Sequence, residues 1–295
     1  MWDRASTFAD DRVIELLREK FVPVAVDCWY LDRSKDAAGE FYKKVVSQRQ
    51  PFEPGVRSTQ GFYAFAPDGA LLRGWNNRNV PRMREYLERA LKDFKPGESE
   101  AIKGDRDPRF ARAIPEGAVV VDVFAKVLEA EWPPTDDEMI KPLRGATGRD
   151  HLWILKDEVE SLAAGKLPER LARRIARFHL VDNTRGEPPH WSPAEAKESK
   201  FGLEGGRISG TAKLESDSKD RSFEAGLSGF VEVRDGKLVR FDLVAHGQFG
   251  GEGQYTRNAP KGKFTLGIAF ALAREGEASK VAPQGARDLR DYLGR

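Results

Sequence analysis

Three stretches in the first third of the chain carry apolar residues at helical spacing. Residues 10–20 place Val13, Leu16 and Leu17 on one side behind an acidic first turn, and residues 37–48 and 81–94 follow the same rule. Residues 21–26 differ, because they form a short apolar run rich in β-branched side chains. The pattern therefore predicts three amphipathic helices, with a buried strand directly after the first.

A hairpin is predicted between the second and third helices. Residues 60–66 and 70–73 flank Pro67, Asp68 and Gly69, which are typical turn residues. The resulting order is helix, strand, helix, hairpin and helix. A polar tract broken by Pro96 and Gly97 follows, so we expect a first domain over residues 1–98.

The remainder, residues 99–295, is predicted to be a β-rich domain. Residues 118–128 resemble one long strand, and helices are expected near residues 157–178. Residues 206–274 then contain four long segments in which apolar and polar positions alternate strictly, as in an antiparallel meander with one apolar face. Asp235 and Gly236 predict a tight hairpin between the second and third segments. Several glycines indicate a curved sheet, and the fold class is α+β.

The amino-acid composition argues against several classes of function. Lysine and arginine number 49 against 47 acidic residues, so no global positive charge favours nucleic-acid binding. No apolar run reaches the roughly 20 residues that cross a bilayer. One cysteine, Cys28, cannot form an internal disulfide or a cysteine-based zinc cluster. No cofactor or metal is expected, and we expect a soluble cytoplasmic protein, with a processed exported protein left open.

The first third resembles thioredoxin-like domains. Residues 7–13 and 16–27 resemble the active-site helix and the following strand of that family, and residues 61–69 resemble its later hairpin. The resemblance covers about a third of the chain. It implies a thioredoxin-like α/β module, followed by a curved antiparallel sheet domain with helical insertions for which we recognise no family.

The chain departs from that family where the family does its chemistry. By the resemblance, the dithiol falls at or before Met1, and no residue from Trp2 to Thr7 is cysteine. The position of the family's cis-proline is taken by Gln60. The strand that precedes the first helix is also missing. Either Met1 is not the natural start, or a strand such as residues 118–128 takes that place.

Two sets of residues could still carry chemistry. Cys28 follows the predicted strand beside Asp27 and Trp29, an environment that disfavours a thiolate, so we expect a buried, inert thiol. The weak catalytic candidates are His246, Asp242 and Arg240. Alternation places all three on the polar face of one strand, where they could supply acid-base and anion-holding groups or remain a solvated surface.

Further features carry weaker signals. His179, Asp182, His190 and Trp191 form a second candidate near Pro188 and Pro189. Arg170, Arg173, Arg174 and Arg177 repeat at helical spacing and are interpreted as the solvated face of a helix. The glycine-rich residues 247–253 lack the following helix that a phosphate loop needs. Small residues in 264–273 indicate close packing by a helix or by a ligand.

The leading interpretation is a redox-inactive thioredoxin-like binding or scaffold protein, whose partner is an unknown protein or small molecule. The alternative is an enzyme that uses the His246, Asp242 and Arg240 site, with or without a metal, in the second half. A single-cysteine catalyst acting through Cys28 is a third hypothesis.

Overall fold

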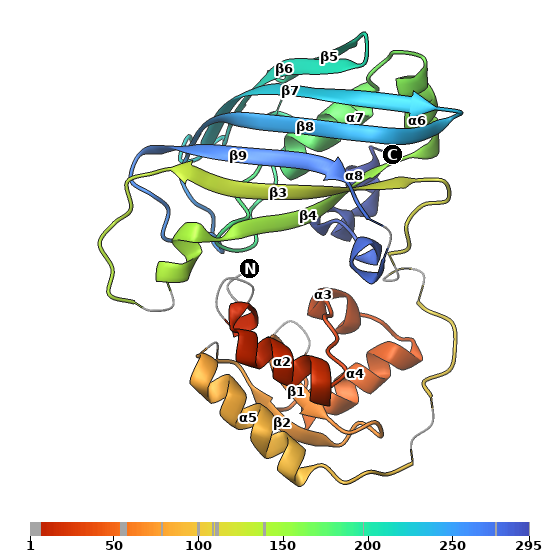
Figure 1. Ribbon diagram of the computed structural model, residues 1–295, viewed down its shortest axis with the longest axis vertical. Helices are drawn as coiled ribbons and strands as arrows, with labels where there is room; N and C mark the ends of the chain where they lie inside the picture. The colour runs from red at the N-terminus through yellow and green to blue at the C-terminus, as the bar shows by residue number, and fades with distance from the viewer. Residues whose placement is uncertain are drawn as a thin grey trace. The chain divides into compact units, whose positions relative to one another are not determined.

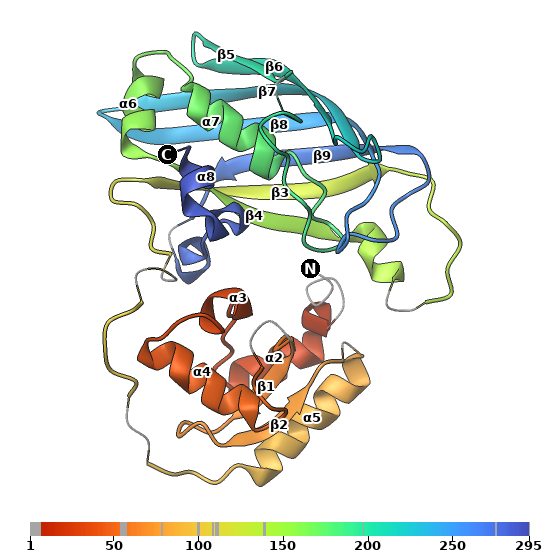
Figure 2. The ribbon, with the colours of Figure 1, turned by 180° about the vertical axis from the view of Figure 1, so that it is seen from behind.

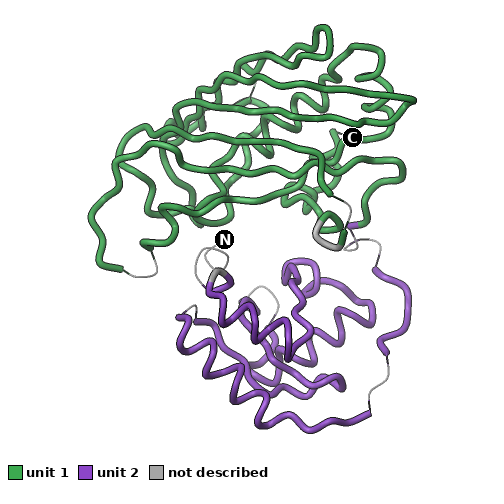
Figure 3. The backbone as a smooth tube through the Cα atoms, viewed as in Figure 1, with its two compact units in different colours: residues 1–5, 113–295 green, residues 6–112 purple. Residues whose placement is uncertain are grey.

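The computed structural model describes residues 7–53, 58–77, 79–98, 101–107, 109, 112–137, 140–196, 198–274 and 276–294. The chain divides into two compact units (Figure 3). Unit 2 lies within residues 6–112, and unit 1 contains residues 113–295. The predicted domain boundary at residue 98 falls inside unit 2, ahead of the 112/113 division.

Unit 2 is helical with one hairpin (Figure 1). Its elements are, in order, η1 (Thr7–Ala9), α2 (Asp11–Lys20), α3 (Cys28–Leu31), α4 (Ala37–Ser47), β1 (Phe62–Phe65), β2 (Leu71–Trp75) and α5 (Val80–Asp93). The three predicted amphipathic helices and the hairpin are confirmed. Gly69 has φ +85° in the turn, a backbone conformation that glycine adopts without strain.

Side-chain caps explain where the three long helices begin. Asp10 accepts hydrogen bonds from the backbone N–H groups of Arg12 and Val13, and Asp36 accepts one from Gly39. Asn79 caps α5 in the same way, with a proline in the first turn of that helix. These caps satisfy N–H groups that have no partner inside a helix. The small core below them contains Val13, Ala64, Trp75, Met83, Leu87 and Ala90.

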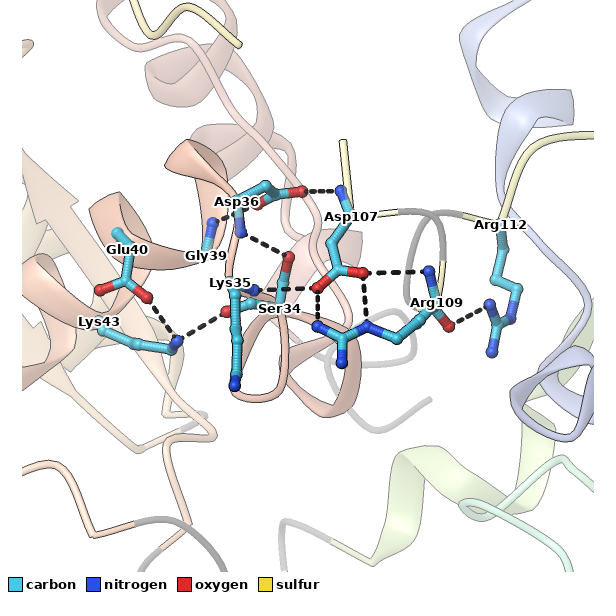
Figure 4. Close-up of polar contacts among 9 residues, drawn as sticks. All are labelled: Ser34, Lys35, Asp36, Gly39, Glu40, Lys43, Asp107, Arg109 and Arg112. Atoms are coloured by element: carbon cyan, nitrogen blue, oxygen red, sulfur yellow. Dashed lines mark hydrogen bonds and ion pairs between the residues drawn. The ribbon is translucent and has the colours of Figure 1, made fainter. Parts of the chain in front are cut away.

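The polar tract after α5 returns to the start of α4 (Figure 4). The backbone N–H of Asp107 donates to Asp36 Oδ2 at 2.8 Å, and that of Lys35 donates to Asp107 Oδ2 at 3.3 Å. Arg109 bonds the same carboxylate, and this bond is the main cause that lowers the pKa of Asp107. Asp36 therefore both caps α4 and anchors residue 107, which explains why this tract belongs to unit 2.

Unit 1 is built on one open antiparallel sheet, with strand order β4-β3-β9-β8-β7-β6-β5. The strands are β3 (Val119–Glu129), β4 (Thr147–Ile154), β5 (Lys200–Glu204), β6 (Arg207–Glu215), β7 (Ser222–Arg234), β8 (Lys237–Gly250) and β9 (Lys263–Leu272). Asp235 and Gly236 have φ +49° and +72°, as the predicted tight hairpin requires. The predicted meander is confirmed.

Helices α6 (Lys156–Ala163), α7 (Glu169–Arg174) and α8 (Leu289–Leu293) of unit 1 lie on one face of this sheet (Figure 2). The unit also contains η2 (Lys141–Gly145), the π-helical turn η3 (Ile175–His179), η4 (Glu277–Lys280) and η5 (Gln284–Arg287). The covered face and the helices share a large apolar core that includes Phe223, Phe241, Leu266, Ile268 and Leu171. The sheet face that α6, α7 and α8 do not cover is called the open face below.

The strand predicted over residues 118–128 exists as β3, yet it does not complete the first module. β3 pairs with β4 on one side and with β9 on the other, so both of its edges are used inside unit 1. The hypothesis that this strand takes the missing place in unit 2 is wrong.

Candidate functional site

The predicted catalytic trio lies on the open face of β8, and only two of its members meet. Arg240 Nε donates to Asp242 Oδ2 at 2.6 Å, and the Arg240 guanidinium also lies over the ring of Phe230. His246 is four residues further along the strand, about 13 Å away at 3.3 Å per residue. The structure thus shows an exposed ion pair and a separate exposed histidine.

The small side chains of β9 have a neighbour that the sequence did not indicate. A Cβ atom on Gly267 would lie 3.0 Å from Leu128 Cδ1, and Leu128 belongs to the adjoining strand β3. Helices α6, α7 and α8 cover the opposite face (Figure 2). The prediction that a helix packs here is wrong, because a cross-strand leucine takes the space.

The arginine stripe is only partly a solvated surface. Arg173 is exposed, whereas Arg174 is buried and forms a paired contact with buried Glu158. Arg174 Nη1 lies 2.9 Å from Oε2 and Nη2 lies 3.1 Å from Oε1. Arg174 also donates to the carbonyl oxygens of Trp153 and Tyr292. The interpretation of the stripe as a fully solvated face is wrong, because sequence periodicity could not reveal a buried carboxylate on α6.

A second buried arginine, Arg177, forms an ion pair with the C-terminal helix α8. Arg177 Nη1 and Nη2 lie 2.6 and 2.7 Å from the two carboxylate oxygens of Asp291 in α8. Arg177 Nε donates to the carbonyl of Trp191. The hydrogen bond from Arg177 is the main cause that lowers the pKa of Asp291, and the guanidinium charge adds to it.

A carboxylate, an imidazole and a phenol form a chain at the centre of unit 1. His179 Nε2 lies 3.0 Å from the hydroxyl of Tyr292, and His179 Nδ1 lies 3.4 Å from Asp150 Oδ2. The three residues come from η3, β4 and α8. His179 belonged to the weaker predicted candidate, whereas Asp150 and Tyr292 were missed. No local spacing signals them, since they lie 29 and 113 residues away from His179.

Burial sets the protonation of Tyr292, whereas the neighbours of Asp150 set that of the carboxylate. Burial raises the pKa of Tyr292 well above its usual value, so the phenol stays neutral. Burial alone would also raise the pKa of Asp150. The hydrogen bond and charge of His179, together with backbone N–H groups of Gln284 and His151, outweigh this effect and lower it. Asp150 is therefore an ionised carboxylate held inside the protein.

His190 lies beside this chain without completing it. Its ring packs edge-on against Phe178, with centroids 5.0 Å apart, and Phe178 packs in the same way against Tyr292. Burial lowers the pKa of His190 to about 4. Within the described part of the chain, His190 Nε2 has no hydrogen-bond partner. His190 is therefore a neutral imidazole at neutral pH that packs against the buried ring of Phe178.

The other members of the second predicted candidate have structural roles. Asp182 Oδ1 accepts hydrogen bonds from the N–H and the hydroxyl of Thr184, and Asp182 Oδ2 lies 2.7 Å from Arg185. Trp191 Nε1 donates to the carbonyl of Leu180. All residues from 174 to 185 are buried. Because buried loops must satisfy their own backbone and side chains, these polar residues hold a non-repetitive segment inside the fold.

The side chains of His179, Asp150 and Tyr292 are enclosed within unit 1. A general acid or base must come within hydrogen-bond distance of the substrate proton. Tyr292 is only 1% exposed. Its hydroxyl already accepts a hydrogen bond from the backbone N–H of Trp153 at 3.4 Å. Over the residues that the structure describes, no three His, Cys, Asp or Glu side chains are placed to hold a metal ion. The chain Asp150, His179 and Tyr292 thus ties β4, η3 and α8 together.

Cys28 is placed differently from the expectation. It is the first residue of the short helix α3, rather than the end of a strand, and it is half-buried. The Asp27 side chain caps this helix by accepting from the backbone N–H of Trp29 at 2.9 Å. The expected full burial of the thiol is wrong, because α3 turns the chain directly after Asp27.

The most unusual surface in unit 2 is the extended segment between α2 and α3, residues 21–27, hereafter the 21–27 segment. It contains no helix, turn or bend, and its ends at Phe21 and Asp27 have extended dihedral angles. Val22, Val24 and Val26 are 90%, 71% and 54% exposed. The predicted buried strand is therefore wrong, because no strand among the described residues pairs with this segment or covers it.

The two edges of the 21–27 segment are not equivalent. In an extended chain, backbone N–H groups point alternately to opposite edges. On the odd-numbered edge, the N–H of Phe21 is bonded to the carbonyl of Leu17, and Pro23 has no N–H. On the even-numbered edge, the N–H groups of Val22, Val24 and Val26 make no hydrogen bond to a described residue. One edge is therefore open to pairing with another strand.

Comparisons with known proteins identify no relative. Scans of protein families, of curated proteins and of solved structures each return no match to this chain. In the part of the chain that the structure describes, no helix is long and apolar enough to cross a membrane.

Proposed function

We propose that this chain is a non-catalytic binding or scaffold protein, in which unit 2 acts as a redox-inactive thioredoxin-like module that forms its interface by accepting a β-strand. The observation that supports this function is the exposed 21–27 segment. Residues 21–26 are uncharged and half of them are valines, whose β-branched side chains favour strand pairing. An extended segment with an open edge is a recurring site for strand addition.

The energetics also favour an occupied edge. A strand that covers the three exposed valines removes their apolar surface from water. This burial stabilises the complex by about 25 cal/mol for each Å² buried. Backbone hydrogen bonds add affinity that does not depend on the partner's side chains. In unit 1, in contrast, the buried carboxylate of Glu158 and the buried guanidinium of Arg174 bond to each other within the unit.

A strand probe tests this function. The probe is a soluble fluorescent peptide in which valine and threonine alternate between terminal lysines. Fluorescence anisotropy should show binding to the full chain. Val24→Pro should weaken binding, because it removes an N–H from the open edge, whereas Ala25→Pro should not, because the N–H of Ala25 points to the other edge. Equal binding by both variants and the wild type, or no binding at all, contradicts the proposal.

A further inference from the structure

The tract that connects α5 to unit 1 runs free for most of its length. α5 ends at Asp93, and the described residues 95–98 and 101–106 are all exposed and belong to no helix or strand. A Cβ atom added to Gly97 or Gly104 would meet no atom within 4 Å. No hydrogen bond or ion pair joins residues 95–98 and 101–106 to another described residue. The tract is therefore not held by packing before it reaches residue 107.

Asp107 is the first anchored residue after α5 (Figure 4). Its attachment to the turn before α4 is reciprocal, and it is called the Asp107 clamp below. The Asp36 carboxylate accepts the backbone N–H of Asp107, and the Asp107 carboxylate accepts that of Lys35. Burial alone would raise the pKa of Asp36, but the bonds from the N–H groups of Asp107 and Gly39 outweigh this effect and lower it. Both carboxylates are therefore ionised acceptors, which form stronger hydrogen bonds than neutral ones.

A second, weaker contact follows at Arg112. Its guanidinium lies over the ring of Tyr30 in α3, 5.4 Å from the ring centroid, and Arg112 Nη1 donates to the carbonyl of Arg109 (Figure 4). An exposed cation–π contact of this kind is weak by itself. The two contacts together keep the exit of the tract on α3 and on the turn before α4.

The position of the clamp decides how much of the tract is free. Ala113, the first residue of unit 1 after the tract, is six residues after Asp107 and nineteen residues after Phe94. A flexible chain of six residues has a root-mean-square end-to-end distance of about 13 Å, and one of nineteen residues has about 24 Å. Loss of the clamp would therefore nearly double the reach of the free tract.

We propose that the Asp107 clamp, supported by Arg112, is a conformational device that shortens the tether between the two units. With the clamp closed, at most six residues separate the last anchored position of unit 2 from unit 1. With the clamp open, the tract is free from Phe94 onward. This role goes beyond strand addition and does not depend on it, because no clamp residue lies in the 21–27 segment.

Distances between two spin labels on the full chain test the device. Because Cys28 is the only cysteine, Cys28→Ser removes the native thiol, and Arg82→Cys and Ser228→Cys introduce one label site in each unit. Arg82 on α5 and Ser228 on β7 are both exposed, so the labels should not disturb either core. Double electron–electron resonance then gives the distribution of distances between the units.

The decisive variant in this labelled chain is Asp107→Ala with Arg112→Ala. It should make the distance distribution about twice as wide, in line with the longer free tract. Lys103→Ala with Asp105→Ala is the matched control. It also removes one positive and one negative charge from the tract, at exposed residues that make no hydrogen bond or ion pair to a described residue, and it should leave the distribution unchanged.

Two results would overturn the proposal. One is a distribution that stays the same in the Asp107 and Arg112 double variant, and the other is equal broadening in the control. The substituted residues lie outside the helices and strands, so all variants should keep the circular dichroism spectrum of the wild type. Asp107→Asn, which removes the charge but keeps the shape of the side chain, gives an independent test and should broaden the distribution less than the double variant. An unchanged distribution in Asp107→Asn and in the double variant would show that the clamp does not limit the tether.

Discussion

Unit 1 and unit 2 differ in how completely they bury their extended segments. Unit 1 surrounds its apolar sheet face with helices and places even charged groups, such as Glu158 and Arg174, inside with their partners. Unit 2 has two paired strands, a small core and three exposed valines in an extended segment. The difference teaches that a large core encloses its apolar segments, whereas the small core of unit 2 leaves an apolar segment exposed.

The buried ion pair of unit 1 gives the largest expected effect. Glu158→Ala leaves Arg174 and one contact of Arg170 without their carboxylate in the interior, which should cost about 3–5 kcal/mol. Hydrogen exchange of the slowest amides in β7 and β8 measures this loss. Glu169→Ala, which removes the exposed partner of Arg173, is the matched control and should change stability by less than about 0.5 kcal/mol. Equal effects would show that Glu158 is not a core residue.

Mild acid should distinguish the units, because all four histidines lie in unit 1. The pKa of His190 is about 4 in the folded state against 6.5 unfolded, so the unfolded state binds the proton more readily. The stability that neutral His190 contributes is fully present above its unfolded-state pKa of 6.5, and it falls as the pH drops toward 4. Between about pH 7 and pH 5 the loss is about 2 kcal/mol.

The slowest amides of unit 1 should report this loss, and those of α5 in unit 2 should not. His190→Phe keeps the aromatic contact with Phe178 and should remove this part of the pH dependence. An unchanged slope in that variant would assign the acid sensitivity to another group.

Within unit 2, two valines with opposite surroundings give the smallest effects. Val24→Ala should change stability by less than about 0.5 kcal/mol when the chain is monomeric, since its side chain is exposed. Val13→Ala should cost about 1.5 kcal/mol or more, from two buried methyl groups at about 0.8 kcal/mol each. Urea denaturation of dilute protein followed through α5 compares them. A large loss for Val24→Ala would mean that the segment is covered within the folded monomer.

Local rules explain what could be predicted. Helices in 10–20, 37–48 and 81–94, the Pro67-Asp68-Gly69 turn and the meander follow from periodicity and turn chemistry, which act over a few residues. β4 and β5 were missed, because β4 begins with polar residues that pair and pack only in the fold. The 21–26 run was assigned as a buried strand, since hydrophobicity predicts burial but cannot supply a neighbour.

The candidate sites show the same division. The sequence alone determined that one cysteine excludes an internal dithiol, that Pro23 removes a donor from one edge, and that Val22, Val24 and Val26 share a strand face. Only the tertiary structure decided that Asp150, His179 and Tyr292 meet, that His246 stands apart from Asp242, and that the 21–27 segment is uncovered. Contacts between distant residues depend on which elements pair, and the chemistry of a segment does not specify its neighbours.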